Sequence, residues 1–272
     1  MKRIFLGALA VCLAALTACA HADGDALRAT FFAAGAADAI LIQTENSAVL
    51  IDAGLKKNAG ELTAALRAAG VKKLDALILT HYDKDHAGGA PAVLEAFGAE
   101  AIYQPDYVKD GKAYERWQTA LQKTDAQVFT LSADAAFELD GARYAISTAR
   151  QRAYERDESN NFSLVVRLEW GETSFLLAGD CEEERLAELL EAGVAPCSVL
   201  KVPHHGRLDA LSGAFFAAAA PQIAVVTSDE DEPEDDEVIA LLREQGAQTL
   251  LTREGEIVCV SDGKTVSARQ KN

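Results

Sequence analysis

Short apolar runs with the length of buried β-strands alternate along most of this chain with segments whose apolar residues recur at helical spacing. The pattern occurs in two successive halves, and each half begins with strand-like runs bounded by turn residues. A helix with one apolar face needs a sheet to cover, and that sheet must bury its other face as well. We therefore predict an α/β protein, a four-layered αββα sandwich with polar loops at the strand ends.

The predicted elements follow the same order in both halves. In the first half, strands are expected at 27–33, 38–44, 47–51, 74–79 and 101–104, with helices at 61–69, 90–97 and 112–123. In the second half, strands are expected at 127–131, 137–139, 142–147, 163–169, 173–178, 198–202, 223–227 and 257–260, with helices at 182–191, 211–219 and 237–245. No low-complexity linker separates the halves, so we expect residues 28–272 to form one domain.

The charge balance limits the classes of partner. Lys and Arg number 26 and Asp and Glu 42, which gives a formal net charge of −16. Neutralisation of phosphates supplies most of the affinity for nucleic acid, so a long basic track for a polyanion is not expected. Cys181, Cys197 and Cys259 form no CxxC pair, and we expect small buried side chains at these positions.

The N-terminus has the features of a secretory signal. Lys2 and Arg3 precede the apolar stretch 4–16, which is too short to span ~30 Å of hydrocarbon as a stable helix. The sequence Leu16-Thr17-Ala18-Cys19 resembles the bacterial lipobox, in which cleavage before the cysteine is followed by lipidation of its thiol.

These features predict export of the mature chain. We expect a signal peptide over 1–18, a lipid on Cys19 and a short tether over 19–27. The lipid would anchor the protein to a membrane, either on the outer face of the bacterial cytoplasmic membrane or elsewhere in the envelope. The alternative is free secretion after cleavage behind Ala20, because residues 18–20 also have the small-x-small form of a cleavage site.

Apart from His21, every histidine falls in one of two short loops. The first loop, residues 80–89, follows the predicted strand 74–79 and places four possible metal ligands in six positions. These ligands are His81, Asp83, Asp85 and His86. In an extended or irregular segment the first three would project to one side, and a turn at the fourth would bring its imidazole around. A lone histidine is usually a core or surface residue, but this density of ligand types indicates metal binding.

Ligand-type residues also end two strands of the second half. The loop 202–206, Val-Pro-His-His-Gly, follows the predicted strand 198–202, and Asp180 follows the strand 173–178. Residues at the ends of neighbouring strands can meet in one site. For Asp180 alone, a turn or a helix N-cap before Glu182 is an equally good explanation.

At this point the sequence resembles a known superfamily. His81-x-Asp83-x-Asp85-His86-x-Gly88-Gly89 resembles the metallo-β-lactamase signature HxHxDH in its HxDxDH form. Together with Leu-Lys-Val-Pro-His-His-Gly at 200–206, it is similar to the hydrolase domain of ComEC-type competence proteins for DNA uptake and their stand-alone relatives. Further matching stretches are 38–42, 50–54, 161–167 and 177–180. The resemblance spans roughly residues 28–262 and implies the αββα metallo-β-lactamase fold.

The resemblance also implies a centre of two divalent ions. The implied ligands are His81 and Asp83 for one ion, Asp85 and His86 for the other, Asp180 as the bridge, and either His204 or His205 to complete the second site. The histidine that does not ligate would contact the substrate or protonate the leaving group. Asp83, Asp85 and His205 are the predicted catalytic residues. Asp52 would orient the loop through hydrogen bonds rather than bind an ion.

Such a centre is suited to hydrolysis. Two ions bridged by a carboxylate and a water would deliver hydroxide near neutral pH and stabilise charge on the attacked and departing oxygens. Several aspartates favour a hard ion such as Mn²⁺, with Zn²⁺ as the alternative. A phosphodiester fits because each of its two non-bridging oxygens can meet one ion. We therefore expect a metal-dependent phosphodiesterase or nuclease-like enzyme. The alternatives are hydrolysis of another ester, lactone or lactam, and a binding protein without turnover.

Three departures from the family pattern bear on the substrate. Gly35-Ala36-Ala37-Asp38 stands in place of Gly-Gln-Gly-Asp, and Arg207 follows the HHG sequence in place of serine. The acidic run 229–237 replaces a segment with the pattern Asn-x-Tyr-Gly-His-Pro. The run is expected to be a solvated loop, and its charge opposes a polyanion, whereas Arg207 could contact a single phosphate. We expect a small anionic ester or phosphodiester as substrate rather than long nucleic acid; the sequence indicates no oligomeric state.

Overall fold

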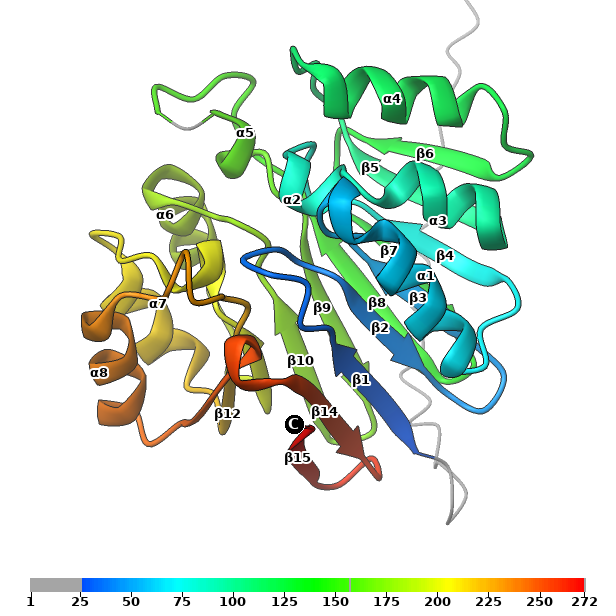
Figure 1. Ribbon diagram of the computed structural model, residues 1–272. Helices are drawn as coiled ribbons and strands as arrows, with labels where there is room; N and C mark the ends of the chain where they lie inside the picture. The colour runs from blue at the N-terminus through cyan, green and yellow to red at the C-terminus, as the bar shows by residue number, and fades with distance from the viewer. Residues whose placement is uncertain (1–25, 157, 272) are drawn as a thin grey trace, which may run out of the picture.

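Two β-sheets pack face to face, and helices cover the outer face of each (Figure 1). The structure, a computed structural model, describes residues 26–156 and 158–271. The arrangement is the predicted four-layered αββα sandwich, and this prediction is confirmed. The predicted signal peptide 1–18 and Cys19 lie outside the described residues. The predicted tether runs to residue 27, but Leu27 is the first residue of a strand and is fully buried.

The first sheet has eight strands in the order β15-β14-β1-β2-β3-β4-β5-β6. Pairing is antiparallel from β15 to β3 and parallel from β3 to β6. The strands are β1 Leu27–Phe31, β2 Ile40–Gln43, β3 Ala48–Ile51, β4 Leu74–Ile78, β5 Ala99–Pro105, β6 Gln127–Leu131, β14 Glu256–Ser261 and β15 Val266–Lys271. Its outer face is covered by α1 Ala59–Ala68, α3 Ala90–Phe97 and α4 Lys112–Leu121.

The second sheet has seven strands in the order β13-β12-β11-β10-β9-β8-β7. Pairing is antiparallel from β7 to β10 and parallel from β10 to β13. The strands are β7 Ala135–Leu139, β8 Ala142–Ser147, β9 Val165–Trp170, β10 Thr173–Leu177, β11 Val199–Lys201, β12 Ile223–Val226 and β13 Gln248–Leu251. Its outer face is covered by α6 Glu183–Ala192, α7 Ser212–Ala219 and α8 Asp236–Glu244.

The central strands are apolar throughout because both of their faces are buried. In β10, Phe175 and Leu177 face the opposite sheet, while Leu176, which lies between them in the sequence, faces the helices on the outer side. A strand with two buried faces reads as a continuous apolar run, which explains why these strands could be recognised from the sequence. Within the described ranges, none of the helices combines the length and the apolar character needed to cross a membrane.

Two strands and two short α-helices of the described residues were not predicted. Strand β15 has alternating half-buried and exposed residues, and β13 has one fully exposed and three half-buried positions, so neither has a strong apolar signal. The one-turn helices α2 Lys84–Ala87 and α5 Glu158–Asn161 are too short for periodicity to reveal them. Cys181, Cys197 and Cys259 are buried free thiols, as expected.

Loops from both sheets meet at one end of the sandwich. The loop after β4 contains His81, the loop after β10 contains Asp180, and the loop after β11 contains the two histidines of the HHG sequence. Backbone hydrogen bonds join these loops: Leu164 N donates to Thr80 O at 2.9 Å, and His204 N donates to Gly179 O at 3.2 Å. The parallel strands therefore bring the predicted ligands to a common edge.

Candidate metal centre

The first ligand loop is extended only as far as Asp83 and then becomes helical. The carbonyl of Asp83 accepts hydrogen bonds from His86 N at 3.1 Å and Ala87 N at 2.8 Å, which closes the single turn of α2. Of the two conformations expected for this segment, extended or irregular, the extended one ends at Asp83 and does not include Asp85. Asp85 and His86 both lie in this turn, and each places a ligand atom within 4.8 Å of one from His205.

Gly89 lets this loop lie directly on the loop after β3. Gly89 N donates to Gly54 O at 2.9 Å, and an added Cβ at Gly89 would lie 2.2 Å from the carbonyl oxygen of Ala53. No side chain fits at that separation, so glycine is required by the close approach of two backbones. The approach fixes α2 against the edge of the first sheet.

Asp52 orients His86 through a hydrogen bond. The Nδ1 of His86 donates to Asp52 Oδ2 at 2.8 Å, and Asp52 also accepts from Thr80 N at 2.8 Å and Thr80 Oγ1 at 2.7 Å. Both carboxylate oxygens are thereby occupied, and the residue is fully buried. This leaves Nε2 of His86 directed at the other ligands, the arrangement that the resemblance implied for Asp52.

The HHG loop has a left-handed backbone at three consecutive residues. His204, His205 and Gly206 have φ values of 46°, 52° and 80°. Left-handed conformations at non-glycine residues cost about 1–3 kcal/mol each and are concentrated at functional sites. Gly206 is required because an added Cβ would lie 2.8 Å from both Val226 Cγ1 and Glu234 Cβ.

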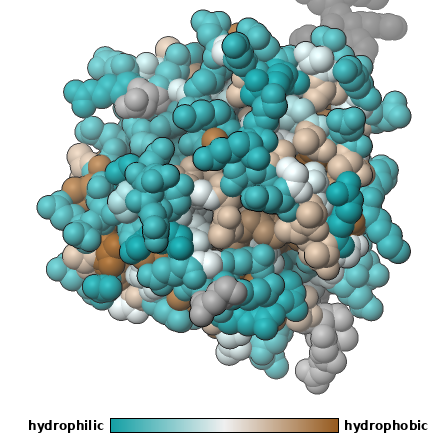
Figure 2. Space-filling view, in the orientation of Figure 1, coloured by the Kyte–Doolittle hydropathy of each residue, from teal (hydrophilic) through white to brown (hydrophobic). Residues whose placement is uncertain are grey.

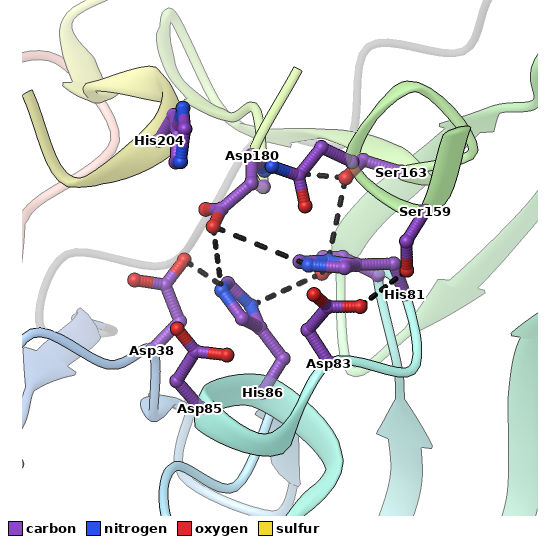
Figure 3. A network of polar contacts seen from close by, with 12 residues as sticks. Asp38, His81, Asp83, Asp85, His86, Ser159, Ser163, Asp180 and His204 are labelled. Carbon is purple, nitrogen blue, oxygen red and sulfur yellow. Dashed lines mark hydrogen bonds and ion pairs between the residues drawn. The ribbon is translucent and has the colours of Figure 1, made fainter. Parts of the chain in front are cut away.

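This backbone turns the two histidines in different directions. The Nδ1 of His205 donates to Thr227 O at 2.9 Å, and its Nε2 lies 3.1 Å from Asp180 Oδ2. The Nδ1 of His204 instead lies 3.1 Å from Glu182 Oε1, and its side chain is one-third exposed. In Figure 3, His204 lies to one side of the contacts that join the other residues. Of the two candidates, His205 is the one placed with the ligand cluster.

Four side chains converge on one position. Asp85, His86, Asp180 and His205 each offer one ligand atom, and these atoms all lie within 4.8 Å of one another. Asp180 Oδ2 is central: it lies 3.0 Å from His86 Nε2 (Figure 3). The same oxygen lies 3.1 Å from His205 Nε2. Two imidazoles and two carboxylates at this spacing form a donor set that suits Zn²⁺ or Mn²⁺.

His81 points at the same carboxylate from the other side. Its Nε2 is buried, lies 4.0 Å from Asp180 Oδ2 and has no hydrogen-bond partner. Thr80 Oγ1 donates its proton to Asp52, so the contact of 3.0 Å between Thr80 Oγ1 and His81 Nδ1 requires a proton on Nδ1. Burial, aided by His86, lowers the pKa of His81 to about 3. A neutral imidazole with a buried, unpartnered lone pair is costly unless it binds a cation, so these residues fit a metal ion.

Asp83 is held apart from that cluster by other partners. Its Oδ1 accepts hydrogen bonds from Lys109 Nζ and Ser159 Oγ, and Ser159 is paired in turn with the hydroxyl of Tyr107 at 2.8 Å. The Asp83 side chain is about one-third exposed. Asp83 therefore lies beside His81 at the edge of the site and is bound by a cation from the loop after β5.

The buried charges favour a cation at the cluster. Burial by itself would raise the pKa of Asp180, but His205, His86 and Lys201 hold this pKa well below its ordinary value. Burial would likewise lower the pKa of His86, but Asp180, Asp52 and Asp38 hold it well above 6.5. The raised pKa of His86 has the sign expected where carboxylates concentrate negative potential in a buried space, and the lowered pKa of Asp180 keeps that carboxylate ionised.

Two buried residues of the site, Lys201 and Asp38, were not predicted to have a role. Lys201 Nζ contacts Asp38 Oδ2 at 2.6 Å and Asp180 Oδ1 at 3.3 Å, and Asp38 Oδ1 accepts from Thr227 Oγ1 at 2.6 Å. One signal was available: Lys201 is a charged residue inside the apolar run 198–202. Asp38 lies just before β2 of the first sheet, whereas its partner Lys201 ends β11 of the second sheet.

The acidic run 229–237 packs against the HHG loop. Asp235 N donates to Gly206 O at 2.9 Å, and Asp235 Oδ2 accepts from Leu208 N at 2.7 Å. The guanidinium of Arg207 lies 3.8 Å from Asp235 Oδ1 and is exposed. The run therefore supports the loop that carries His205, while the residues 230–233 at its tip are exposed.

Comparison with known proteins identifies the family. The family model of the metallo-β-lactamase superfamily matches residues 33–227, a range that contains every described ligand candidate. The chain belongs to the metallo-β-lactamase superfamily. Its family and its cluster of ligand atoms together make it a metal-dependent hydrolase of that superfamily.

Competence proteins are among the relatives of this superfamily member, which confirms the ComEC-type resemblance. Competence protein ComA of Neisseria gonorrhoeae is 30% identical over 206 residues, 73% of this chain and 26% of that protein. ComE operon protein 3 of Bacillus subtilis is 32% identical over 167 residues, 60% of this chain and 21% of that protein. The chain thus spans about a quarter of the length of these relatives.

A solved structure shares the fold. The metallo-β-lactamase fold protein YhfI from Bacillus subtilis superposes with a TM-score of 0.57 at 14% identity, covering 90% of this chain and all of that one. At this identity the likeness shows the fold alone.

Proposed function

We propose that this protein is an exported metallo-β-lactamase-fold hydrolase that cleaves small phosphodiesters or other small anionic esters. The observation that carries the proposal is the convergence of Asp85, His86, Asp180 and His205 on one position, with the unpartnered Nε2 of His81 facing the same carboxylate. The first four residues would hold one divalent ion, Zn²⁺ or Mn²⁺. His81 and Asp83 would hold a second beside it.

Divalent ions at such a site polarise a phosphoryl or carbonyl oxygen and make a nucleophile available at neutral pH. The chain's own residues orient the reacting groups. The side chain of Asp85 is partly exposed and faces the solvent side of the cluster, whereas Asp180 is buried behind it. The substrate would therefore approach over Asp85.

His204 would contact the substrate rather than protonate its leaving group. Burial lowers the pKa of His204, so the imidazole is neutral at pH 7. With Nδ1 donating to Glu182, its Nε2 remains as an acceptor for a hydroxyl or water on the substrate side.

Charge supports a small substrate over a long polyanion. Lys109 lies beside Asp83, and Arg207 follows the HHG loop, so each is a cation next to the ligand loops that could meet an anionic group. The face of the molecule in Figure 2 is largely hydrophilic, and the exposed tip of the acidic run adds negative charge to a chain whose net charge is −16. A strand of several nucleotides would be opposed by this field, and the repulsion would weaken as salt is added.

The substrate is tested by comparing kcat/KM for bis-p-nitrophenyl phosphate and for a long oligonucleotide at low and moderate salt. We expect the small diester to be cleaved more efficiently, and added salt to help the oligonucleotide. Efficient cleavage of the oligonucleotide that falls steeply with salt would instead indicate a basic track and a nuclease. Bound metal without turnover on any ester would indicate a binding protein.

Export and anchoring are supported by the N-terminal sequence. The proposed lipid on Cys19 is tested with Cys19→Ser, which should give a soluble secreted protein or an uncleaved precursor in place of a membrane-anchored one. Intact mass of the unaltered protein should show the lipid. Unchanged fractionation of the variant, with no lipid mass on the unaltered protein, would contradict the anchor.

A further inference from the structure

Lys201 is a fully buried cation whose three protons are all used in hydrogen bonds. It ends strand β11, and its Nζ lies 2.6 Å from Asp38 Oδ2, 2.9 Å from Gly179 O and 3.3 Å from Asp180 Oδ1. The side chain has no exposed surface. Val199, two residues earlier on the same face of the strand, belongs to the apolar core between the sheets, so an apolar side chain would suit this face equally well.

Stability is a weak explanation for this arrangement. Removing a charge from water costs several kcal/mol, and replacing a buried ion pair with packed apolar residues is often neutral or stabilising. Both carboxylates that Lys201 contacts are also almost completely buried. The position of the ammonium directly behind a candidate metal ligand points to a role in the site.

Lys201 divides the two oxygens of Asp180 between different tasks. Oδ1 contacts the ammonium of Lys201, whereas Oδ2 lies 3.0 Å from His86 Nε2 and 3.1 Å from His205 Nε2. The same Oδ2 lies 4.0 Å from the unpartnered Nε2 of His81. The single oxygen Oδ2 therefore faces His86 and His205 on one side and His81 on the other. Rotation of the carboxylate away from this orientation would break the contact between Oδ1 and Lys201.

The contact with Asp38 extends this control to His205. Asp38 Oδ1 accepts from Thr227 Oγ1 at 2.6 Å, and the backbone oxygen of Thr227 accepts from His205 Nδ1 at 2.9 Å. Lys201 is thus joined to two of the four converging ligands, to Asp180 directly and to His205 through Asp38 and Thr227. The ammonium also offsets one of the buried negative charges without occupying the ligand position.

We propose that Lys201 is a positioning residue that holds Asp180 with one oxygen, Oδ2, turned toward the ligand cluster and thereby sets the metal affinity of the centre. This inference rests on the proposed metal centre, but it does not depend on which ester is cleaved. The competing explanation is that Lys201 merely neutralises Asp38. The two explanations differ in what happens when the Lys201–Asp38 pair is removed as a unit.

The test compares the unaltered protein with Lys201→Met, Asp38→Asn and the double variant Lys201→Met/Asp38→Asn. Lys201→Met alone should lower the Tm because it leaves Asp38 buried without a counter-ion. The double variant removes both charges, so its Tm should return close to that of Asp38→Asn. Each protein is stripped of metal and titrated with Co²⁺, and affinity and the visible absorption spectrum of the bound ion are recorded.

We expect the double variant to bind Co²⁺ at least tenfold more weakly than Asp38→Asn and with an altered spectrum, because Asp180 is free to rotate. If the two bind Co²⁺ with the same affinity and spectrum, Lys201 acts only as a counter-ion and the inference is wrong. If the double variant does not fold, the comparison is made with Lys201→Leu/Asp38→Asn, in which residue 201 again offers Asp180 no donor. Normal Co²⁺ binding by an unaltered protein that cleaves no ester would refute the proposed function while leaving this test intact.

Discussion

His86 and Asp52 form a buried hydrogen bond of 2.8 Å that connects the ligand helix α2 with the end of strand β3. The bond uses Nδ1 of the imidazole, so Nε2 is the nitrogen that lies 3.0 Å from Asp180. Asp52 has φ of 57°, a left-handed conformation held in place by its hydrogen bonds to Thr80. The direction of a candidate metal ligand is therefore fixed by a strand end of the first sheet.

Asp52→Asn should weaken metal binding without unfolding the protein. Asparagine tolerates the left-handed backbone, but its amide nitrogen faces one of the donors from His86 or Thr80 and cannot accept it. Loss of such an orienting partner typically lowers metal affinity or activity about 10- to 100-fold. Zn²⁺ titration of the metal-stripped variant measures the change, with the exposed and distant Asp125→Asn as control. An affinity equal to that of the control would show that Asp52 does not orient a ligand.

The two histidines of the HHG loop should respond differently to alanine. His205→Ala removes a member of the converging set, so both bound metal and hydrolysis should be lost. His204→Ala should retain metal content while lowering kcat/KM, because its imidazole faces Glu182 at the edge of the site. Metal analysis and steady-state kinetics on both variants decide the assignment. Loss of metal from His204→Ala with normal metal in His205→Ala would reverse it.

The ligand loops could be predicted from the sequence, but the separate roles of His204 and His205 could not. The loops and their ligand types could be recognised because apolar strand runs such as 74–79 end directly before them. The choice between His204 and His205 depends on consecutive left-handed φ angles, which no pattern of residue types specifies. The helical turn that brings Asp85 beside His86 contains only four residues, too few for a periodic signal.

Long-range pairing accounts for the remaining misses. Asp38 and Lys201 form an ion pair across the site, yet Asp38 precedes β2 of the first sheet and Lys201 ends β11 of the second. In the sequence, each of the two residues is only a single charged position in or next to an apolar run, which does not indicate a partner. Their pairing exists only once the two sheets are packed, so it could not be derived from local sequence.

Gly89→Ala should destabilise the fold at the ligand loop. The added Cβ would lie 2.2 Å from the carbonyl oxygen of Ala53, so α2 must move away from the sheet edge. Overpacking of this kind typically costs about 1–3 kcal/mol of unfolding free energy. The matched control is Gly60→Ala in α1, where an added Cβ meets no atom within 4 Å, and its stability should be unchanged or slightly raised. Equal urea midpoints for the two variants would contradict the close approach.

Lys109 should contribute to recognition of anionic substrates. The ammonium lies against Asp83 at the edge of the site, where we expect it to meet the phosphate of a substrate. A hydrogen bond to a charged group is worth ~1.5–3 kcal/mol, so Lys109→Gln should raise KM for bis-p-nitrophenyl phosphate roughly tenfold or more. KM for neutral p-nitrophenyl acetate should be unaffected. The control is Lys84→Gln, because Lys84 is exposed and lies next to the ligands in the sequence. An equal rise in KM for both substrates in Lys109→Gln would indicate a structural role for Lys109.

Hydrolysis is expected to depend on a divalent ion held by Asp85, His86, Asp180 and His205. This dependence is tested most directly by stripping the protein of metal and measuring turnover of bis-p-nitrophenyl phosphate as Mn²⁺ or Zn²⁺ is returned, in parallel with bound metal per chain. The account predicts that activity disappears on stripping, returns in proportion to bound metal, and does not return in Asp180→Asn. Full activity in the metal-free protein, or restored activity in Asp180→Asn, would contradict it.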